Sequence, residues 1–557
     1  MSLLDPGYGR PPVDHHLVAG LPTPNGPTHL GHLGGPFLRL DVLARFQRLC
    51  GNRAFLISGT DVFESHVELA SARSGVPSSE IAGRYHAEIE RDLASLDIPH
   101  DAFIDPLDST WSARYRWWHH HLLTRLRALG CVETRRERVL YSRHSDRYLF
   151  GGFLRGRCPE CGQPVVGGSC EQCGMWFSPG TIVEPGSSLD ESGLEWREVS
   201  NLFLRVPDAD LHRLLSGPDL LPEHRRVLRS YLAREGPYWP LTQQSAWGVQ
   251  GPAEVTAPAV FATYGLGILA YAALCGQEYG LLSGTGANAL APGSGVITVS
   301  AQGFDSIVPD AFAIAVLRML TPELGAYGTL TLNRYLLLEG SKFSTSRRHA
   351  IWTREVAQVL DSDVVRHYLA RVSPDVAETD FRVDEFVALA NRHLVFGLDR
   401  CARDGWDRLS AGPASGSPSW LHLAQPSGAW VDHLEELLQR QRAALDPGRL
   451  RLAEVVRALD EWPDAGAGLD AGGGLRGADP AAAYWWLKGA AVLAASVMPR
   501  WALATWRRLG HDADPRLSAF WQTPPPIGAP EPASGRRFEP LDVATVRQLT
   551  GVGSSSD

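Results

Sequence analysis

The stretch GLPTPNGPTHLGHLGG (residues 20–35) follows the apolar run HHLVAGLP (15–22) and leads into the helical pattern FLRLDVLARFQRLCG (37–51). We interpret it as the turn between a β-strand and an α-helix. A glycine-rich turn in this position lets a polyphosphate approach backbone amides at the positive end of the helix. Its two histidines, His29 and His32, can hydrogen-bond phosphate oxygens during attack at the α-phosphorus. A metal-binding pair and two surface histidines are the alternatives.

Patterns of short apolar strands alternating with helices predict a parallel sheet with crossover helices, and this α/β rhythm is interrupted once. The interruption carries a cysteine cluster and a charged helix, and the region after the second α/β part is a run of amphipathic helices typical of a bundle. The expected organisation is a first α/β half (1–125), an insertion (126–240), a second α/β half (241–385), a helical bundle (386–520) and a Pro/Ser-rich tail (521–557).

The bulk composition is that of an ordinary globular protein of several domains, with 557 residues and a formal net charge of −9. This charge gives no global attraction to nucleic acid, so an RNA partner needs a local basic patch. The first residues form no apolar signal-like segment, so we expect a cytoplasmic protein with no membrane partner. The apolar stretch 255–277 is long enough to span a bilayer, but its proline and glycines favour a buried strand running into a buried helix.

The segment CPECGQPVVGGSCEQCG (158–174) holds two C-x-x-C pairs. Four thiolates at this spacing fit a tetrahedral Zn²⁺, and an emptied knuckle is the alternative. Because all four ligands are protein sulfurs, such a site is structural and leaves no position open for a substrate. The expected ligands are Cys158, Cys161, Cys170 and Cys173.

The segment EGSKFSTSRRHAIW (339–352) places Lys342, two arginines and several hydroxyls after a glycine. Such a loop suits a second clamp on a triphosphate. Taken alone, a solvated basic turn explains it equally well.

In order and spacing, GLPTPNGPTHLGH, FLISGTD, the four-cysteine knuckle, GFDSI and SKFSTSR resemble the methionyl-tRNA synthetases of class I, over about residues 15–510. HLGH looks like the HIGH signature of that family and KFSTS like its KMSKS loop. The resemblance implies an α/β fold: a Rossmann-type catalytic domain with a zinc-knuckle connective insertion, then a C-terminal α-helical bundle that contacts the anticodon. It also implies an adenylate-forming ligase that joins an amino acid to ATP as an aminoacyl adenylate, with Mg²⁺ and a structural Zn²⁺.

The same resemblance assigns roles to individual residues. Asp61 in SGTD falls where the family holds the α-amino group, and Gly303 and Asp305 fall where it holds the ATP ribose, although these two could equally be turn residues. The implied catalytic residues are His29, His32, Lys342, Ser344 and Ser346. The implied ATP-binding residues are Thr23, Asn25, Gly31, Gly303, Asp305, Lys342 and Arg347. The implied amino-acid-binding residues are Leu21, Asp61, Tyr264, Tyr271 and Asp310.

The departures from the family concern the lysine loop and the side-chain pocket. Thr345 stands where the family has a second lysine. Tyr264, Leu266 and Ile268 stand in the methionine pocket, and Asp310 replaces a histidine that closes on the thioether. Because an unpaired buried carboxylate is costly, methionine is poorly matched, and Asp310 could face an amine on another amino acid or on a second substrate.

The helical region also departs from the family. Asp404 stands where the family's asparagine contacts the anticodon, and a carboxylate is repelled by phosphate. The tryptophans of this region lie at helical spacing in an apolar segment, so we expect them in the core rather than as stacking platforms: Trp485, Trp486, Trp501 and Trp506.

Three hypotheses follow. The first choice is ATP-dependent activation of an amino acid with transfer to a small amine or hydroxylamine, such as an N-hydroxylated amine. This resembles the synthetase-like part of hydrazine synthetases, with a separate cupin protein as partner. The alternative is a divergent aminoacyl-tRNA ligase that charges tRNA. A non-catalytic sensor on a synthetase scaffold is disfavoured, because the histidine pair, Asp61 and Lys342 are all present.

Overall fold

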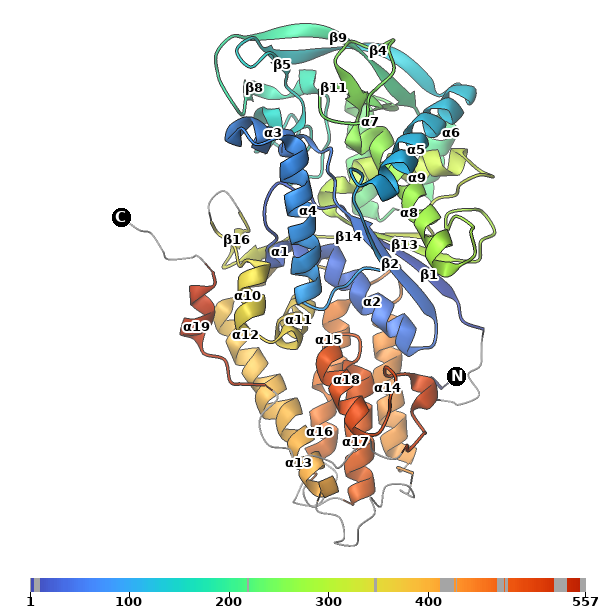
Figure 1. Cartoon of the computed structure of the whole chain (residues 1–557), viewed down its shortest axis with the longest axis vertical. Coiled ribbons are helices and arrows are strands. Elements are labelled where there is room, and N and C mark those ends of the chain that lie inside the picture. The colour runs from blue at the N-terminus through green and yellow to red at the C-terminus, as the bar shows by residue number, and fades with distance from the viewer. Residues whose placement is uncertain are drawn as a thin grey trace.

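The computed structural model describes residues 2–4, 11–217, 220–344, 348–410, 425–426, 428–467, 475, 479–524 and 538–550. Figure 1 shows an elongated molecule with three levels along its long axis. An antiparallel sheet with β4 and β9 lies at one end, the parallel sheet lies in the middle and helices α13 to α18 form the other end.

The central sheet is parallel throughout, in the order β14-β13-β1-β2-β3. Its middle strand β1 pairs with β13, which lies nearly 300 positions further along the chain, so that Leu17 faces Val299 in the register. The strands are β1 (Asp14–Ala19), β2 (Arg53–Gly59), β3 (Ala102–Ile104), β13 (Ile297–Gly303) and β14 (Thr329–Asn333).

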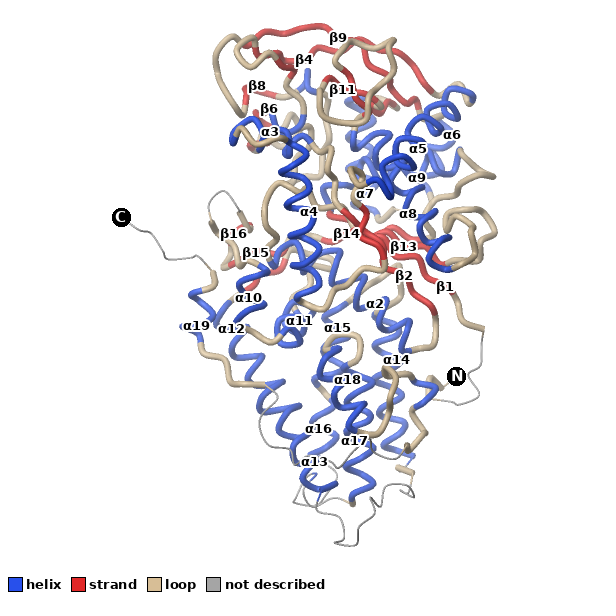
Figure 2. Tube along the Cα trace, in the orientation of Figure 1, coloured by secondary structure: helices blue, strands red, loops and turns tan. Residues whose placement is uncertain are grey.

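Both faces of this sheet are covered, as Figure 2 shows. Leu17 and Ala19 of β1 belong to one core with α2, whereas Val18 belongs to the other core with α8 and α9. The near-continuous apolar character of β1 follows from this, because a parallel strand is buried on both sides. The helices of this α/β part are α1 (Leu30–His32), α2 (Leu38–Leu49), α3 (Ser65–Ser74), α4 (Ser78–Ser95), α5 (Ser109–Ala128), α8 (Ile268–Ser283) and α9 (Ile307–Met319).

The inserted region is built on a long antiparallel pair, β4 (Val132–Ser142) with β9 (Leu194–Arg205). It extends to β5 (Arg147–Tyr148) and β10 (Tyr238–Pro240) in the order β10-β9-β4-β5. The cysteines lie near a separate small sheet. The remaining elements are β6 (Leu154–Arg157), β7 (Pro164–Val166), β8 (Val183–Ser187), α6 (Asp208–Ser216), α7 (Pro222–Glu235), β11 (Thr242–Gln244) and β12 (Ala259–Phe261).

A three-stranded sheet and two helices link the parallel sheet to the helical end. They are β15 (Leu336–Leu338), β16 (Ser341–Lys342), β17 (Thr379–Phe381), α10 (Thr353–Val359) and α11 (Ser362–Arg371). The helical end contains α12 (Val383–Leu389), α13 (Arg400–Ser410), α14 (Gly428–Ala444), α15 (Leu452–Asp460), α16 (Trp462–Ala467), α17 (Pro480–Ala494) and α18 (Pro499–Arg508), and α19 (Val543–Gln548) contacts α12. The core prediction for the tryptophans is confirmed, since all four are at most 3% exposed: Trp485, Trp486, Trp501 and Trp506.

The apolar stretch 255–277 forms β12, a wide helical turn η4 (Thr263–Gly267) and most of α8. The expected buried strand running into a buried helix is therefore confirmed. Among the described residues, none of the helices combines the length and the hydropathy needed to cross a bilayer.

Candidate active site

A cavity of about 1050 Å³ opens at the carboxyl ends of β1, β2 and β13. Ligands of open parallel sheets bind at this edge. Every described residue of the three non-metal predicted sets lines it: Leu21, Thr23, Asn25, His29, Gly31, His32, Asp61, Tyr264, Tyr271, Gly303, Asp305, Asp310, Lys342 and Ser344. Ser346 and Arg347, together with Thr345, lie outside the described residues.

Backbone hydrogen bonds join the histidine stretch to the segment after the lysine loop. The Leu30 N–H donates to the Ile351 carbonyl at 3.0 Å, and the Thr353 N–H donates to the Thr28 carbonyl at 3.1 Å. The Phe343 ring stacks on His29 with centroids 4.9 Å apart. These contacts hold Lys342 beside the imidazole pair although some 300 residues separate them.

The imidazoles of His29 and His32 stack with ring centroids 3.8 Å apart. Burial lowers the pKa of His29 well below its ordinary value and lowers the pKa of His32 to about 4. Both rings are therefore neutral at pH 7. Since the Nδ1 atom of His32 accepts the His29 backbone N–H at 3.3 Å, the proton of the neutral ring is on Nε2 and is available to a phosphate oxygen.

Gly31 allows the rings of Phe343 and His29 to pack closely against the backbone. A Cβ atom added there would lie 3.0 Å from both Phe343 Cδ2 and His29 Nδ1, closer than such atoms normally come. A larger residue would force the Phe343 ring or the His29 ring to shift.

Of the two described cations of the loop, Lys342 and Arg348, Lys342 lines the cavity. Its Nζ lies 4.5 Å from the centroid of the Tyr335 ring and forms an ion pair with Glu171. Glu171 lies between Cys170 and Cys173, so the cysteine knuckle reaches the cavity wall.

The amino-acid end of the cavity is acidic. Asp61 follows β2 and is 7% exposed, and burial together with Glu64 raises its pKa well above the ordinary value. Asp310 lies in the first turn of α9, and burial and the Asp305 carboxylate raise its pKa in the same direction. An entering ammonium group would stabilise the ionised form of either acid.

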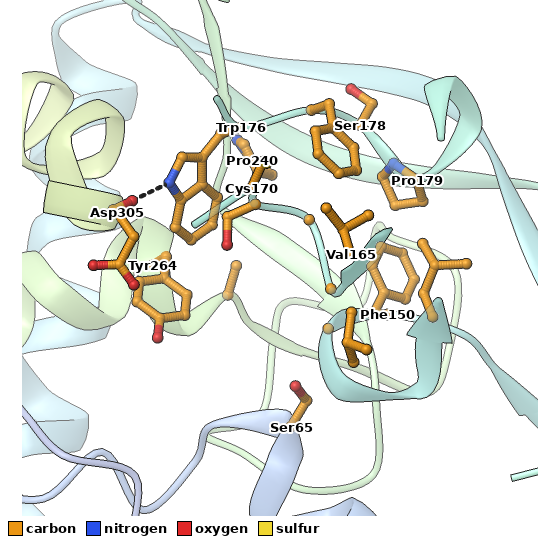
Figure 3. A pocket seen from close by; sticks show the side chains of 18 of the residues that line it. Ser65, Phe150, Val165, Cys170, Trp176, Ser178, Pro179, Pro240, Tyr264 and Asp305 are labelled. Carbon is orange, nitrogen blue, oxygen red and sulfur yellow. Dashed lines mark hydrogen bonds between the residues drawn. The ribbon is translucent and has the colours of Figure 1, made fainter. Parts of the chain in front are cut away.

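Asp305 joins the cavity to the inserted region. The Trp176 indole N–H donates to its backbone carbonyl at 2.6 Å, as Figure 3 shows. A Cβ on Gly303 would lie 2.5 Å from Asp305 Oδ1, so glycine allows this carboxylate to turn back over the end of β13.

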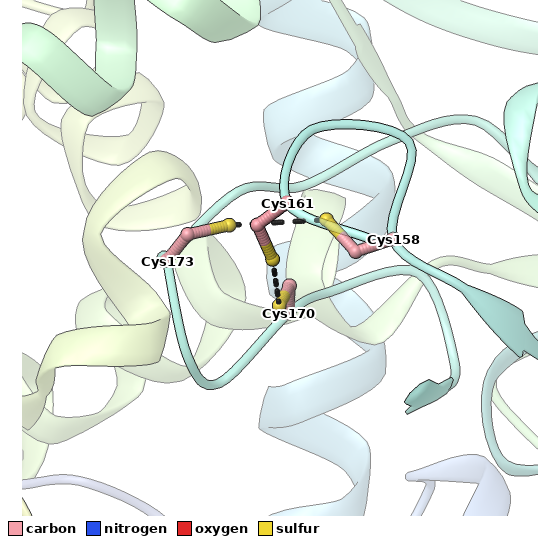
Figure 4. A group of neighbouring side chains, drawn as sticks. All are labelled: Cys158, Cys161, Cys170 and Cys173. Carbon is pink, nitrogen blue, oxygen red and sulfur yellow. Dashed lines mark hydrogen bonds between the residues drawn. The ribbon is translucent and has the colours of Figure 1, made fainter. Parts of the chain in front are cut away.

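The four predicted zinc ligands form one cluster, with sulfur atoms all within 4.8 Å of one another (Figure 4). Two of the separations are 3.8 Å, for Cys158 and Cys173, and 3.6 Å, for Cys161 and Cys170. Tetrahedral zinc with Zn–S bonds near 2.3 Å requires S–S separations of about 3.8 Å. The donor set and its geometry therefore fit a structural zinc ion.

A second cavity of about 970 Å³ adjoins the first and extends under the inserted region (Figure 3). Tyr264, Asp305 and Lys342 line both cavities. Its aromatic wall includes Phe150 and Trp176. Nothing in the sequence pattern indicated this space.

Two points of the sequence-based site differ from the structure. Leu266 does not line the pocket: it is fully buried in the core, because the wide helical turn η4 directs it away from the cavity. Sequence reasoning also missed several lining residues, among them Glu171, Tyr327 and Tyr335. The only signal for Glu171 was its position inside a C-x-x-C pair.

A parallel nucleotide-binding sheet split by a cysteine-bearing insertion, with a histidine pair facing a lysine loop, defines an ATP-dependent ligase with the fold of class I synthetases. A family model described as tRNA synthetases class I (M) matches residues 15–261 and 311–401, and the chain belongs to that family.

Individual proteins similar to this chain are consistent with the family match. The methionine–tRNA ligase of Methanopyrus kandleri is 28% identical over 517 residues, covering 89% of this chain and 75% of the relative. That of a Roseiflexus species is 30% identical over 416 residues, covering 69% and 66%. A crystal structure of Mycobacterium tuberculosis methionyl-tRNA synthetase bound by methionyl-adenylate shares the fold, with a TM-score of 0.70, 20% identity and coverage of 94% and 99%. These names favour the alternative hypothesis, a tRNA ligase, over the small-molecule acceptor.

Proposed function

We propose that this protein activates an α-amino acid with ATP and transfers the aminoacyl group to tRNA. The observation that carries the first step is the single cavity that brings His29, His32 and Lys342 together with Asp61. The relatives support tRNA as the acceptor, since they are named as methionine–tRNA ligases.

In the activation step a carboxylate oxygen of the amino acid bonds to the α-phosphorus of ATP. The bond from that phosphorus to the bridging oxygen breaks, and its electron pair leaves with pyrophosphate. The neutral imidazoles donate hydrogen bonds to the α-phosphate oxygens as charge grows on them. Lys342 turns from Glu171 to the departing pyrophosphate, and Asp61 holds the α-ammonium group. Mg²⁺ bound with ATP would supply further positive charge to the phosphates.

The four cysteines hold a structural zinc ion in this proposal. The cysteines holding it would fix the loop that carries Glu171, and Trp176 just beyond that loop is anchored to the Asp305 carbonyl. The knuckle thus keeps one wall of the active site in position and takes no part in bond making.

The proposed domain limits are those of the sequence pattern: a catalytic domain in two halves (1–125 and 241–385), an insertion (126–240), a bundle (386–520) and a tail (521–557). The insertion lies over the second cavity, where the end of an acceptor has access to the adenylate. In the bundle, Trp462 is fully buried and donates to the Trp486 carbonyl at 3.1 Å, so it offers no face for stacking on an anticodon base.

The second cavity also favours a second candidate, transfer to a small amine or hydroxylamine. Its walls share Tyr264, Asp305 and Lys342 with the first cavity, so a small acceptor bound there would lie next to the adenylate.

The test is amino-acid-dependent exchange of labelled pyrophosphate into ATP over a panel of amino acids, with and without total tRNA. We expect exchange with at least one amino acid and formation of an aminoacyl-tRNA whose ester bond is labile in base. Exchange without charging would favour the small acceptor. Absence of exchange in both conditions would contradict the proposal.

A further inference from the structure

One wall of the amino-acid end carries polar atoms that lack partners. The Oδ2 atom of Asp310 is buried with no hydrogen-bond partner among the described residues, and the buried hydroxyl of Tyr271 has only a weak interaction with the Cys275 thiol. Both side chains line the cavity. Buried polar groups in proteins are nearly always bonded, so these two atoms indicate a ligand that supplies the missing contacts.

The charges around Asp310 leave it without a counter-ion. The titratable groups that face it are Asp305, Tyr264 and Tyr327, none of which is a cation. The basic side chains in the cavity wall, apart from the neutral imidazole pair, already face acids among the described residues: Lys342 pairs with Glu171, Arg334 with Glu223 and His66 with Glu64.

An unpaired carboxylate in such a site either stays protonated or becomes ionised when a cation binds beside it. The thioether of methionine provides no hydrogen-bond donor. Bound methionine would therefore leave the Asp310 carboxyl buried without a partner, which is unfavourable. An amino acid with a second nitrogen would supply one cation to Asp61 and another to Asp310.

We propose that the amino acid activated here carries a basic side chain, an amine or a guanidinium, and that Asp310 is its counter-ion. The inference rests on the proposed function and names the substrate class of the same site. The hydroxyl of Tyr271 accepts a further hydrogen bond from the side-chain nitrogen.

The test measures binding of non-hydrolysable aminoacyl-adenylate analogues by titration calorimetry, which needs neither turnover nor tRNA. The probes are the sulfamoyl adenosines of lysine, ornithine, arginine, methionine and norleucine. We expect at least one basic analogue to bind about tenfold or more tightly than either neutral analogue, the discrimination that one buried charged hydrogen bond provides. An equal or tighter methionyl analogue overturns the inference.

Two variants separate this inference from the proposed function. Asp310→Asn has nearly the same shape and is expected to abolish the preference for the basic analogue while the methionyl analogue keeps its affinity. Asp61→Asn is the matched comparison and should weaken all analogues alike, since each has an α-ammonium group. Retention of the preference in Asp310→Asn contradicts the inference alone. If no analogue binds at all, the inference and the proposed function both fail.

Discussion

The two ends of the main cavity differ in how well their polar groups are balanced. At the ATP end, the histidines are neutral and stacked and Lys342 is paired with Glu171. At the amino-acid end, Asp61 and Asp310 have pKa values raised well above the ordinary value, and Asp310 has a buried oxygen without a partner. The contrast teaches that the residues of the family signature determine the reaction. The residues around the substrate side chain determine which amino acid binds, and they can change while the signature is kept.

The largest effect is expected at the histidine pair. Replacement of His32 by alanine removes a donor to the α-phosphate and should cost roughly 3 kcal/mol of transition-state stabilisation, as for the loss of an oxyanion-hole donor. Pyrophosphate exchange should fall about 100-fold or more, with the KM for the amino acid unchanged.

His32→Asn is the control for folding, because its side-chain oxygen can still accept the His29 backbone N–H. If the alanine variant has the wild-type exchange rate, His32 has a structural role only, and the proposed catalytic role of the histidine pair is wrong.

Lys342→Ala comes next. A hydrogen bond to a charged group contributes about 1.5–3 kcal/mol, so the exchange rate should fall about 10- to 100-fold. The decrease should appear in kcat more than in amino-acid binding, because the pyrophosphate charge develops as it leaves. Steady-state kinetics at varied ATP and amino acid would separate the two, and a change confined to the amino-acid KM would refute a role at the ATP end.

The acidic end predicts a pH effect of smaller size. Because the pKa of Asp310 is raised, lowering the pH through that value protonates the carboxylate and removes the attraction for a cation. Affinity for a basic sulfamoyl adenosine, relative to the methionyl one, should therefore decrease as the pH is lowered through the raised pKa of Asp310. Asp305, Tyr264 and Tyr327 face the same group; burial raises the pKa of both tyrosines well above the ordinary value of 10.0, so Asp305 is the one of these three neighbours that changes charge as the pH is lowered. Calorimetry in paired buffers checks this, and a pH-independent ratio would contradict it.

The smallest effect on activity is expected from loss of the ion pair between Lys342 and Glu171. Glu171 and Lys342 have side chains that are 60% and 41% exposed, and such pairs contribute about 0–1 kcal/mol. Glu171→Gln should lower the KM for ATP by at most about fivefold and leave thermal stability nearly unchanged. A large loss of activity would show instead that Glu171 takes part in the reaction.

Much of the fold was predictable because its signals are local and periodic. Alternating strands and helices indicated the parallel sheet, and the helical spacing of apolar residues indicated the buried tryptophans, as in Trp486. The gathering of the site residues was predictable only from the ordered motifs, since nothing local joins His29 to Lys342.

The remaining features depend on tertiary contacts that no local pattern encodes. The pairing of Lys342 with Glu171 requires the knuckle to dock on the catalytic domain, and the second cavity exists only between the two. Leu266 was assigned wrongly because the wide turn η4 alters which residues face the pocket. Thus the residues of the reaction could be predicted from the sequence, whereas the residues that line the surrounding cavities could not.

The most direct test of the central claim, that one cavity joins ATP chemistry at the histidine pair to a basic amino acid at Asp310, is a crystal structure with lysylsulfamoyl adenosine. The account predicts the sulfamoyl oxygens within hydrogen-bonding distance, about 3 Å, of His29 or His32, and the side-chain nitrogen at the same distance from Asp310. A ligand bound elsewhere, or a side-chain nitrogen pointing away from Asp310 into solvent, would contradict it.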